Sequence, residues 1–203
     1  MKTLYRFFQE APTTLTLALL TLMAFAFNYW ASSTLTASYI ASKFPVPYYV
    51  AQLSFSPEQL KAWYSVLQEL GTFEIYVLTQ HIDSLFILST LLLHCFALVL
   101  ISRLFAEKSK GRKIMVICAL ISAIAPVSDQ LENLVSYLML ADPNNFADGL
   151  AYIYSSFAAT KFVFFVFAYI AAALGLIAGL INQLLTRYQS APSVVTLPNT
   201  QPE

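Results

Sequence analysis

Four apolar stretches, each long enough to cross a bilayer as a helix, constrain this sequence more than any other feature. They cover residues 11–30, 82–102, 114–140 and 162–185. A helix of about 20 predominantly apolar residues spans the hydrocarbon core of a bilayer. The sequence therefore predicts an all-α fold: a polytopic membrane protein in which residues 1–189 form a single domain, a bundle of four transmembrane helices.

The composition argues against a soluble domain. Only 11% of the residues are charged and 58% are hydrophobic, whereas soluble domains carry about 25% charged residues. The formal net charge is zero, so the chain lacks the basic field of a nucleic-acid-binding protein. Its two cysteines, Cys95 and Cys118, lie inside apolar stretches and do not suggest a disulfide framework. We expect the lipid bilayer to be the main partner, and we expect no nucleic acid.

The first stretch has a competing interpretation as a secretory signal. Lys2 and Arg6 precede an apolar core, and a cleavage site of small residues could lie at Ala31-Ser32-Ser33. Signal peptides have apolar cores of about 7–15 residues, and this stretch is longer. Its length favours a retained transmembrane helix.

The distribution of Lys and Arg predicts the orientation in the membrane. Eight of these eleven residues lie near the two termini or in the loop 103–113, and the other three lie on the opposite side. The side with more positive charge normally stays in the cytoplasm. We therefore expect the N-terminus and the C-terminus in the cytoplasm, in a multi-pass protein of a bacterial inner membrane.

Between the first two stretches, residues 57–70 predict an amphipathic helix outside the membrane. Ser56 is a typical N-cap before Pro57, and Gly71 can end the helix in a left-handed conformation. Two interpretations remain open for this helix: a structural cap packed on the bundle, and a lid that gates a binding site. Residues 190–203 contain prolines and no apolar periodicity, which predicts a disordered cytoplasmic tail.

The third stretch carries polar residues that are costly inside a membrane. Asp129, Glu132 and Asn133 are spaced i, i+3 and i+4, so they share one face of a helix. Ionisable residues in a transmembrane helix are functional candidates by default. Two carboxylates on adjacent turns repel each other in a low dielectric unless a cation joins them, and Lys161 is the expected cation. Pro126, one turn before Asp129, is expected to kink the helix.

Further residues are expected in the same layer of the membrane. With a rise of 1.5 Å per residue, Asp129 lies roughly 24 Å, Glu132 roughly 28 Å and Asp83 roughly 30 Å above the cytoplasmic boundary. The predicted cluster near the outer leaflet comprises Asp83, Asp129, Glu132, Asn133, Lys161 and His81. Two interpretations stay open: a binding or catalytic site, and a structural or headgroup-level network.

His94 is a secondary candidate, because it lies near the predicted midplane, three helical turns after Asp83. It could belong to a proton path along that face, or it could be a structural histidine hydrogen-bonded to a hydroxyl. The cluster contains residue types that bind zinc or iron, but the Glu-x-x-His pairs of a di-iron site do not occur. Phosphate-binding, dinucleotide-binding and nucleophile motifs do not occur either, so we expect no metal and no cofactor.

The fourth stretch carries Ala171, Gly175 and Gly179 at four-residue intervals. Small residues at this spacing form a ridge that lets another helix approach closely. The ridge could pack within the chain or between subunits. A homo-oligomer or another membrane partner therefore remains open.

Several short motifs resemble a family of uncharacterised bacterial four-span membrane proteins. The most specific is Asp129-x-x-Glu132-Asn133, after an apolar run. The others are Ser56-Pro57-Glu58-Gln59, Leu70-Gly71, Tyr76, Asp83-Ser84-Leu85-Phe86 and Lys161. The chain departs from the family at Phe73-Glu74, where a small and a basic residue are expected. The resemblance implies the four-span architecture and supplies no activity.

Three functions remain open from the sequence, and it does not decide between binding and catalysis. The first is a pocket for a lipophilic small molecule, lined by the cluster and walled by Phe and Tyr. The second is a non-catalytic structural or assembly protein. The third is a proton- or cation-coupled transporter or channel subunit, for which the apolar run 114–125 offers no polar route and no inverted repeat is visible.

Overall fold

The computed structural model describes residues 12–189, and all secondary structure in this range is helical. Four helical units are long and apolar enough to cross a membrane. They are α2 (Thr14–Ser42), α5 (Phe73–Ser102), α6 (Lys110–Ser122) with α7 (Ile124–Ala141), and α8 (Asp148–Gln189). This confirms the predicted all-α fold and a multi-pass membrane protein. The predicted tail 190–203 lies outside the described residues, as do Lys2 and Arg6.

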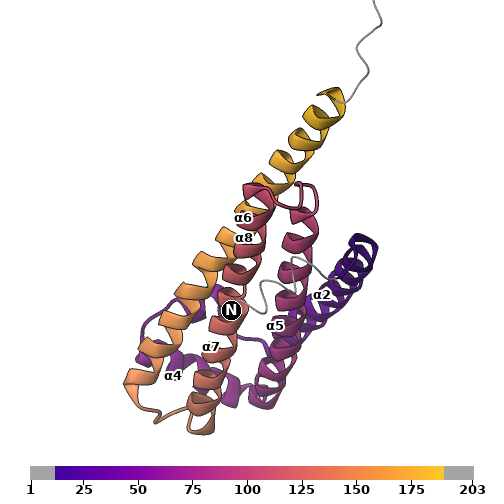
Figure 1. The fold of residues 1–203 in the computed structure, drawn as a ribbon. Helices are drawn as coiled ribbons and strands as arrows, with labels where there is room; N and C mark the ends of the chain where they lie inside the picture. Colours follow the sequence, from indigo (N-terminus) through magenta and orange to yellow (C-terminus); the bar gives the residue numbers. More distant parts are fainter. Residues whose placement is uncertain (1–11, 190–203) are drawn as a thin grey trace, which may run out of the picture.

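The helix α5 is the centre of the bundle. It packs against α2, α6, α7 and α8. Figure 1 shows α6 and α7 end to end, with α8 alongside both and extending beyond the end of α6. The helix α2 packs mainly on α5, and α8 packs mainly on α7. The first and last spans are therefore held through their neighbours rather than by each other.

Three helices extend beyond the apolar stretches that predict them. The helix α2 continues to Ser42 rather than ending near residue 30, and α5 begins at Phe73 rather than near residue 82. The helix α8 likewise begins at Asp148 rather than near residue 162. A hydrogen bond of 2.7 Å between Ser38 Oγ and Thr79 Oγ1 joins the extensions of α2 and α5. Much of the segment between the first two apolar stretches is therefore helical.

Two short helices, α3 (Tyr48–Gln52) and α4 (Pro57–Glu69), complete the segment between α2 and α5. Ser56 Oγ accepts a hydrogen bond from the Gln59 amide at 3.2 Å, which is the predicted N-cap. Gly71 follows with a φ of +66°, the left-handed conformation that glycine adopts without strain. The side chains of Leu60 and Leu67 are fully buried. The helix α4 is therefore a packed cap on the bundle, joined to α5 and α8.

The bundle has two apolar cores. One, here called the aromatic core, gathers side chains from α3, α4, α5, α7 and α8 and from the segments that follow α2 and α7. The other, the aliphatic core, joins α2, α5 and α6. Principal members of the aromatic core are Phe44, Leu60, Tyr64, Tyr76, Met139, Phe146 and Tyr154. Those of the aliphatic core are Leu17, Leu98, Val99, Met115 and Ala119.

The third span is interrupted between its two halves. The helix α6 ends at Ser122 and α7 begins at Ile124, so Ala123 forms the junction. Pro126 lies in the first turn of α7, where its missing N–H costs least. Ser122 Oγ donates to the Ala119 carbonyl at 2.9 Å inside the bundle. The expected disturbance near Pro126 is thus a helix junction, and it lies just before Asp129.

The small-residue ridge of α8 packs inside the chain. A Cβ atom at Gly175 would lie 2.5 Å from the side chain of Met115, and one at Gly179 would lie 2.7 Å from Cβ of Leu104. Ala171 packs against the aliphatic core. The ridge therefore lets α8 approach α6 and the end of α5 closely. Of the two interpretations left open by the sequence, intrachain packing is the one observed.

Candidate functional site

An ion-pair cluster joins α7 to α8. Lys161 Nζ lies 2.6 Å from Asp129 Oδ1 and 2.6 Å from Glu132 Oε2. The exposed fractions of the three side chains are 5% for Lys161, 3% for Asp129 and 0% for Glu132. Because Asp129 and Glu132 are three residues apart on a helix, both can reach the same ammonium group. The cation expected from the sequence is therefore in place.

A hydrogen bond connects this cluster to α5. Asn133 Nδ2 donates to Asp83 Oδ2 at 2.8 Å, and both residues are buried. Asp83 also lines the same cavity as Asp129 and Lys161. Five of the six predicted cluster residues are thus brought together. They contribute three carboxylates and one ammonium group.

His81 is the predicted cluster residue that the structure places elsewhere. Its ring is exposed and stacks on Tyr137 with 5.2 Å between the centroids. Its Nδ1 is 3.2 Å from the Tyr137 hydroxyl. Since His81 and Asp83 are two residues apart on α5, their side chains leave the helix in different directions. His81 and Asp83 are at a similar height in the membrane, but their side chains lie on different faces of α5.

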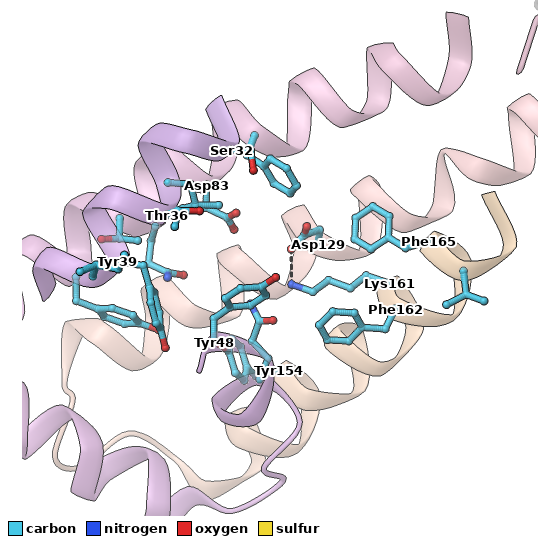
Figure 2. A pocket seen from close by; sticks show the side chains of 18 of the residues that line it. Ser32, Thr36, Tyr39, Tyr48, Asp83, Asp129, Tyr154, Lys161, Phe162 and Phe165 are labelled. Carbon is cyan, nitrogen blue, oxygen red and sulfur yellow. Dashed lines mark hydrogen bonds and ion pairs between the residues drawn. The ribbon is translucent and has the colours of Figure 1, made fainter. Parts of the chain in front are cut away.

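A cavity of about 430 Å³ lies beside the cluster, between α2, α3, α5, α7 and α8. Figure 2 shows the charged side chains of Asp83, Asp129 and Lys161 among aromatic rings. Those three line the cavity, whereas Glu132 and Asn133 are buried behind them. The cavity is therefore largely apolar with a small charged floor. Its aromatic walls are Tyr39, Tyr48, Tyr76, Phe86, Tyr154, Phe162, Phe165 and Tyr169.

Two carboxylate oxygens on this floor remain unused. Asp83 bonds through Oδ2 and Asp129 through Oδ1. Within residues 12–189, Oδ1 of Asp83 and Oδ2 of Asp129 have no hydrogen-bond partner. Buried carboxylate oxygens normally accept hydrogen bonds. The floor can therefore accept additional donors from a molecule in the cavity.

Cavity-lining residues that are more than half exposed lie on α2, α3 and α8, and Tyr48 of α3 is 55% exposed. Ile40 of α2 and Val166 and Tyr169 of α8 line the cavity, and they are 70%, 55% and 63% exposed. Figure 2 shows Ser32 and Thr36 on one side of the cavity and Phe162 and Phe165 on the other. A side opening in a membrane-spanning bundle faces lipid rather than water. A ligand that dissolves in the bilayer could enter by this route.

Buried polar atoms without hydrogen-bond partners among the described residues lie on α7 and α4. Glu132 Oε1, Ser136 Oγ and Tyr64 Oη are buried and form no hydrogen bond within the part of the chain that the structure describes. Ser136 follows Glu132 by one turn, and Tyr64 comes from α4. Burial raises the pKa of the Tyr64 phenol above its ordinary value. The phenol therefore remains protonated, and the cap covers this side of the cluster.

His94 of α5 contacts two aromatic residues of the cavity wall but does not itself line the cavity. Its ring contacts Phe165 and Tyr169 edge to face, with centroids 5.8 Å and 5.5 Å apart. Among the described residues, its buried Nδ1 has no hydrogen-bond partner, so this atom does not form the bond to a hydroxyl that one of the two interpretations required. The hydrogen-bond partner of Asp83 is Asn133 and not a residue that connects it to His94. Within residues 12–189, no hydrogen bond links Asp83 to His94.

The contribution of α2 was missed from the sequence. Ser32, Thr36 and Tyr39 line the cavity because α2 continues as a helix past the apolar stretch. Their spacing of four and three residues places them on one face of a helix. This spacing would have predicted a shared face if the first helix had been predicted to continue past residue 30. Asn28 was missed as well: its Nδ2 donates to Ser89 Oγ at 3.0 Å and to Thr90 Oγ1 at 2.8 Å. These bonds fix α2 to α5 below the cavity.

Within residues 12–189, no group of three or more His, Cys, Asp or Glu side chains is arranged to hold a metal ion. In the cluster, Lys161 occupies the position between the two carboxylates of α7.

Comparison with protein-family models, with curated proteins and with solved structures found no match. The site must therefore be interpreted from its own chemistry.

Proposed function

We propose that this protein binds a lipophilic small molecule, which enters the cavity from the bilayer between α2 and α8. One observation carries the proposal: a cavity of about 430 Å³ with aromatic walls ends on the buried charged groups Asp83, Asp129 and Lys161. Ligand pockets usually have volumes of about 300–1,000 Å³, apolar walls and a few well-placed polar groups. This cavity has all three properties.

The cost of burying these charges supports a site rather than a scaffold. Apolar side chains of similar size would join α5, α7 and α8 at least as well as buried ion pairs do. Charged groups retained in a membrane span usually serve a ligand, an ion or a proton. Here two of the carboxylates and the ammonium group line an accessible space. We assign them to ligand binding and assign no reaction.

The two other functions have weaker support. The glycine ridge is occupied by α6 and the end of α5, so Gly175 and Gly179 do not offer an assembly surface. A transport route would have to continue past the aliphatic core, where Leu98, Val99 and Met115 are buried. Binding requires neither feature.

We also propose that both termini face the cytoplasm of a bacterial cell and that the cavity lies in the outer leaflet of its inner membrane. The charge asymmetry of the loops supports this orientation. We further propose membership of the four-span family that the chain resembles, since Asp129, Glu132 and Asn133 all lie in the cluster. A topology reporter fused at Ser109 should read cytoplasmic and one at Ser56 external. The reverse pattern would contradict the orientation.

The binding proposal can be tested with a tryptophan reporter at the cavity opening. Tyr169→Trp, in a background with Trp30→Phe and Trp63→Phe, places the only indole beside the cavity. The matched control is Ile170→Trp, whose side chain is exposed and does not line the cavity. Both variants are reconstituted in zwitterionic nanodiscs and titrated with octanol carrying a terminal bromine, which quenches indole fluorescence at short range.

The expected result is saturable quenching at residue 169 and quenching proportional to the membrane concentration of the probe at residue 170. Saturation indicates a site with a fixed capacity, whereas proportionality indicates partition into lipid. Proportional quenching at both positions would contradict the proposal.

A further inference from the structure

We infer that the cavity selects amphiphiles with a cationic amine head, whose ammonium group sits against Asp83 and Asp129 while the apolar tail lies along α8 toward lipid. This inference rests on the proposed function and deepens it by naming the class of ligand. A lipid headgroup amine and a free alkylamine share this chemistry.

The charges of the cluster carry the inference. The cluster has three buried carboxylates and one ammonium group. The ammonium group of Lys161 forms ion pairs with Asp129 and Glu132. Asp83 is left with a neutral partner, the amide of Asn133. Buried charges are stable when they are paired and costly when they are not. The cluster therefore has fewer positive than negative groups, and Asp83, the carboxylate without a cationic partner among the described residues, lines the cavity.

The unused oxygens place that shortage where a ligand can reach it. Asp83 is 9% exposed and Asp129 is 2% exposed, and both line the cavity. Oδ1 of Asp83 and Oδ2 of Asp129 have no hydrogen-bond partner within residues 12–189. An ammonium group brings up to three donors and one positive charge. It would satisfy both oxygens, whereas a hydroxyl has only one donor and an anionic head would be repelled.

The aromatic walls favour the same head group. Cations are attracted to the faces of aromatic rings within about 6 Å of the centroid. Lys161 already shows this contact, with Nζ 5.4 Å from the centre of Phe162. Tyr76 and Tyr154 also line the cavity, and both are almost fully buried. A second cation would thus meet carboxylates and aromatic rings together.

The geometry of α8 gives the direction of the tail. Lys161 lies at the charged floor, and Tyr169 lies at the lipid-exposed opening. Eight residues of helix separate them, a rise of about 12 Å. Phe162, Phe165 and Val166 line the path between the two. A single alkyl chain of moderate length fits this apolar path with its head at the floor.

The competing explanation is that protons alone supply the missing positive charge. In that case the cavity would accept a lipophilic molecule without preference for an amine. The test therefore compares three octyl probes with a terminal bromine that differ only in the head group: an amine, an alcohol and a carboxylic acid. Quenching of the Tyr169→Trp reporter is measured in zwitterionic nanodiscs, and Ile170→Trp corrects for partition of each probe.

We expect the amine to saturate the reporter at a concentration at least tenfold lower than the alcohol, and the acid to show no saturation. Equal half-saturation of amine and alcohol would overturn the inference and leave the proposed function standing. Proportional quenching by all three probes would overturn both. Only the reporter substitutions are needed for this comparison, so it leaves the cluster intact.

A cluster variant then locates the selectivity. Asp83→Asn should bring the half-saturation of the amine to within threefold of that of the alcohol. The matched control is Glu74→Gln, which removes an exposed carboxylate from the first turn of the same helix and should leave the tenfold preference intact. An unchanged preference in Asp83→Asn, or its loss in Glu74→Gln, would show that general electrostatics rather than the cavity floor selects the amine.

Discussion

The helices pack closely around the aliphatic core and leave a cavity beside the charged cluster. Around the aliphatic core, Gly175 and Gly179 let α8 approach so closely that an added Cβ atom would collide with Met115 or Leu104. Around the charged cluster, the helices are instead separated by a cavity with bulky aromatic walls. At Gly175 and Gly179 the contact leaves no room for even one added carbon atom, whereas beside the cluster the helices leave a cavity of about 430 Å³. The difference indicates that the cavity is a specific feature of this bundle rather than loose packing throughout.

Charge follows the same division. The buried ion pairs of Lys161 and the hydrogen bond between Asn133 and Asp83 lie beside the cavity. Within the described part of the chain, no ion pair joins the apolar members of the aliphatic core, although α5 and α6 also bury Ser102, Arg112 and Ser122 toward that end. Polar groups buried in a membrane span lower stability unless they are satisfied, whereas close helix packing raises it. We therefore expect the tightly packed end to provide stability and the charged end to provide function.

The largest expected effect comes from removing the one cation of the cluster. Lys161→Met leaves three buried carboxylates without a positive partner, and breaking a buried ion pair in this way costs about 3–5 kcal/mol. The matched control is Lys61→Met. Lys61 pairs with Asp148 at the same distance of 2.6 Å, but its side chain is 28% exposed and that of Asp148 is 63% exposed.

The control should lose only about 0–1 kcal/mol, because exposed ion pairs contribute little. Unfolding free energies from titration with a denaturing detergent provide the measurement. Equal losses in the two variants would mean that the cluster behaves as if it were in water. The distinction between the two ends would then fail.

Several features of the fold and of the cluster could be predicted from the sequence. Apolar length predicted the four spans, and helical spacing predicted that Asp129, Glu132 and Asn133 share a face. The short list of available cations identified Lys161 as their partner. Each of these predictions depends on local periodicity or on a choice among very few residues.

What the sequence did not predict depends on long-range packing. The predicted height of His81 is similar to that of the cluster, but its side chain leaves α5 in another direction, and the ring lies on Tyr137. The cavity requires α2 to continue past its apolar stretch, which brings Ser32 and Thr36 opposite α8. The partner of the glycine ridge also depends on which helices meet. Local sequence patterns do not show which helices and side chains meet in the folded bundle.

A medium effect should follow from filling the close approach on α8. Gly179→Ala adds a Cβ atom that would lie 2.7 Å from Cβ of Leu104, an atom close to the backbone that cannot turn aside. Overpacking of this kind costs about 1–3 kcal/mol. Gly175→Ala should cost less, since its nearest neighbours are the flexible end atoms of Met115. Thermal unfolding in detergent ranks the two variants.

Gly149→Ala is the matched control on the same helix. Nothing lies within 4 Å of a Cβ atom at Gly149, and alanine favours helix over glycine by up to about 1 kcal/mol. The control should therefore be neutral or slightly more stable than the parent protein. If Gly179→Ala unfolds at the same temperature as the parent, α8 is not held by this contact, and the tightly packed end does not provide stability as we propose.

The smallest expected effect concerns Glu132, and its sign separates a working site from a scaffold. Glu132→Gln reduces the cluster from three carboxylates to two while Lys161 keeps its contact with Asp129. The substitution removes like-charge repulsion in a low dielectric. The new amide can also meet Ser136 and Tyr64, which are buried beside this end of the cluster without hydrogen-bond partners among the described residues. We therefore expect a change within about 1 kcal/mol, toward higher stability, as for strained functional sites.

Glu74→Gln controls for the loss of a carboxylate as such, because Glu74 is exposed in the first turn of α5. It should leave stability unchanged or lower it slightly, since an acidic residue near a helix N-terminus is weakly stabilising. Unfolding free energies of both variants are compared at one pH and one detergent concentration. A loss of about 3 kcal/mol or more in Glu132→Gln, as expected for breaking a satisfied buried pair, would identify the cluster as a structural network. The charged end would then stabilise the bundle just as the glycine ridge does.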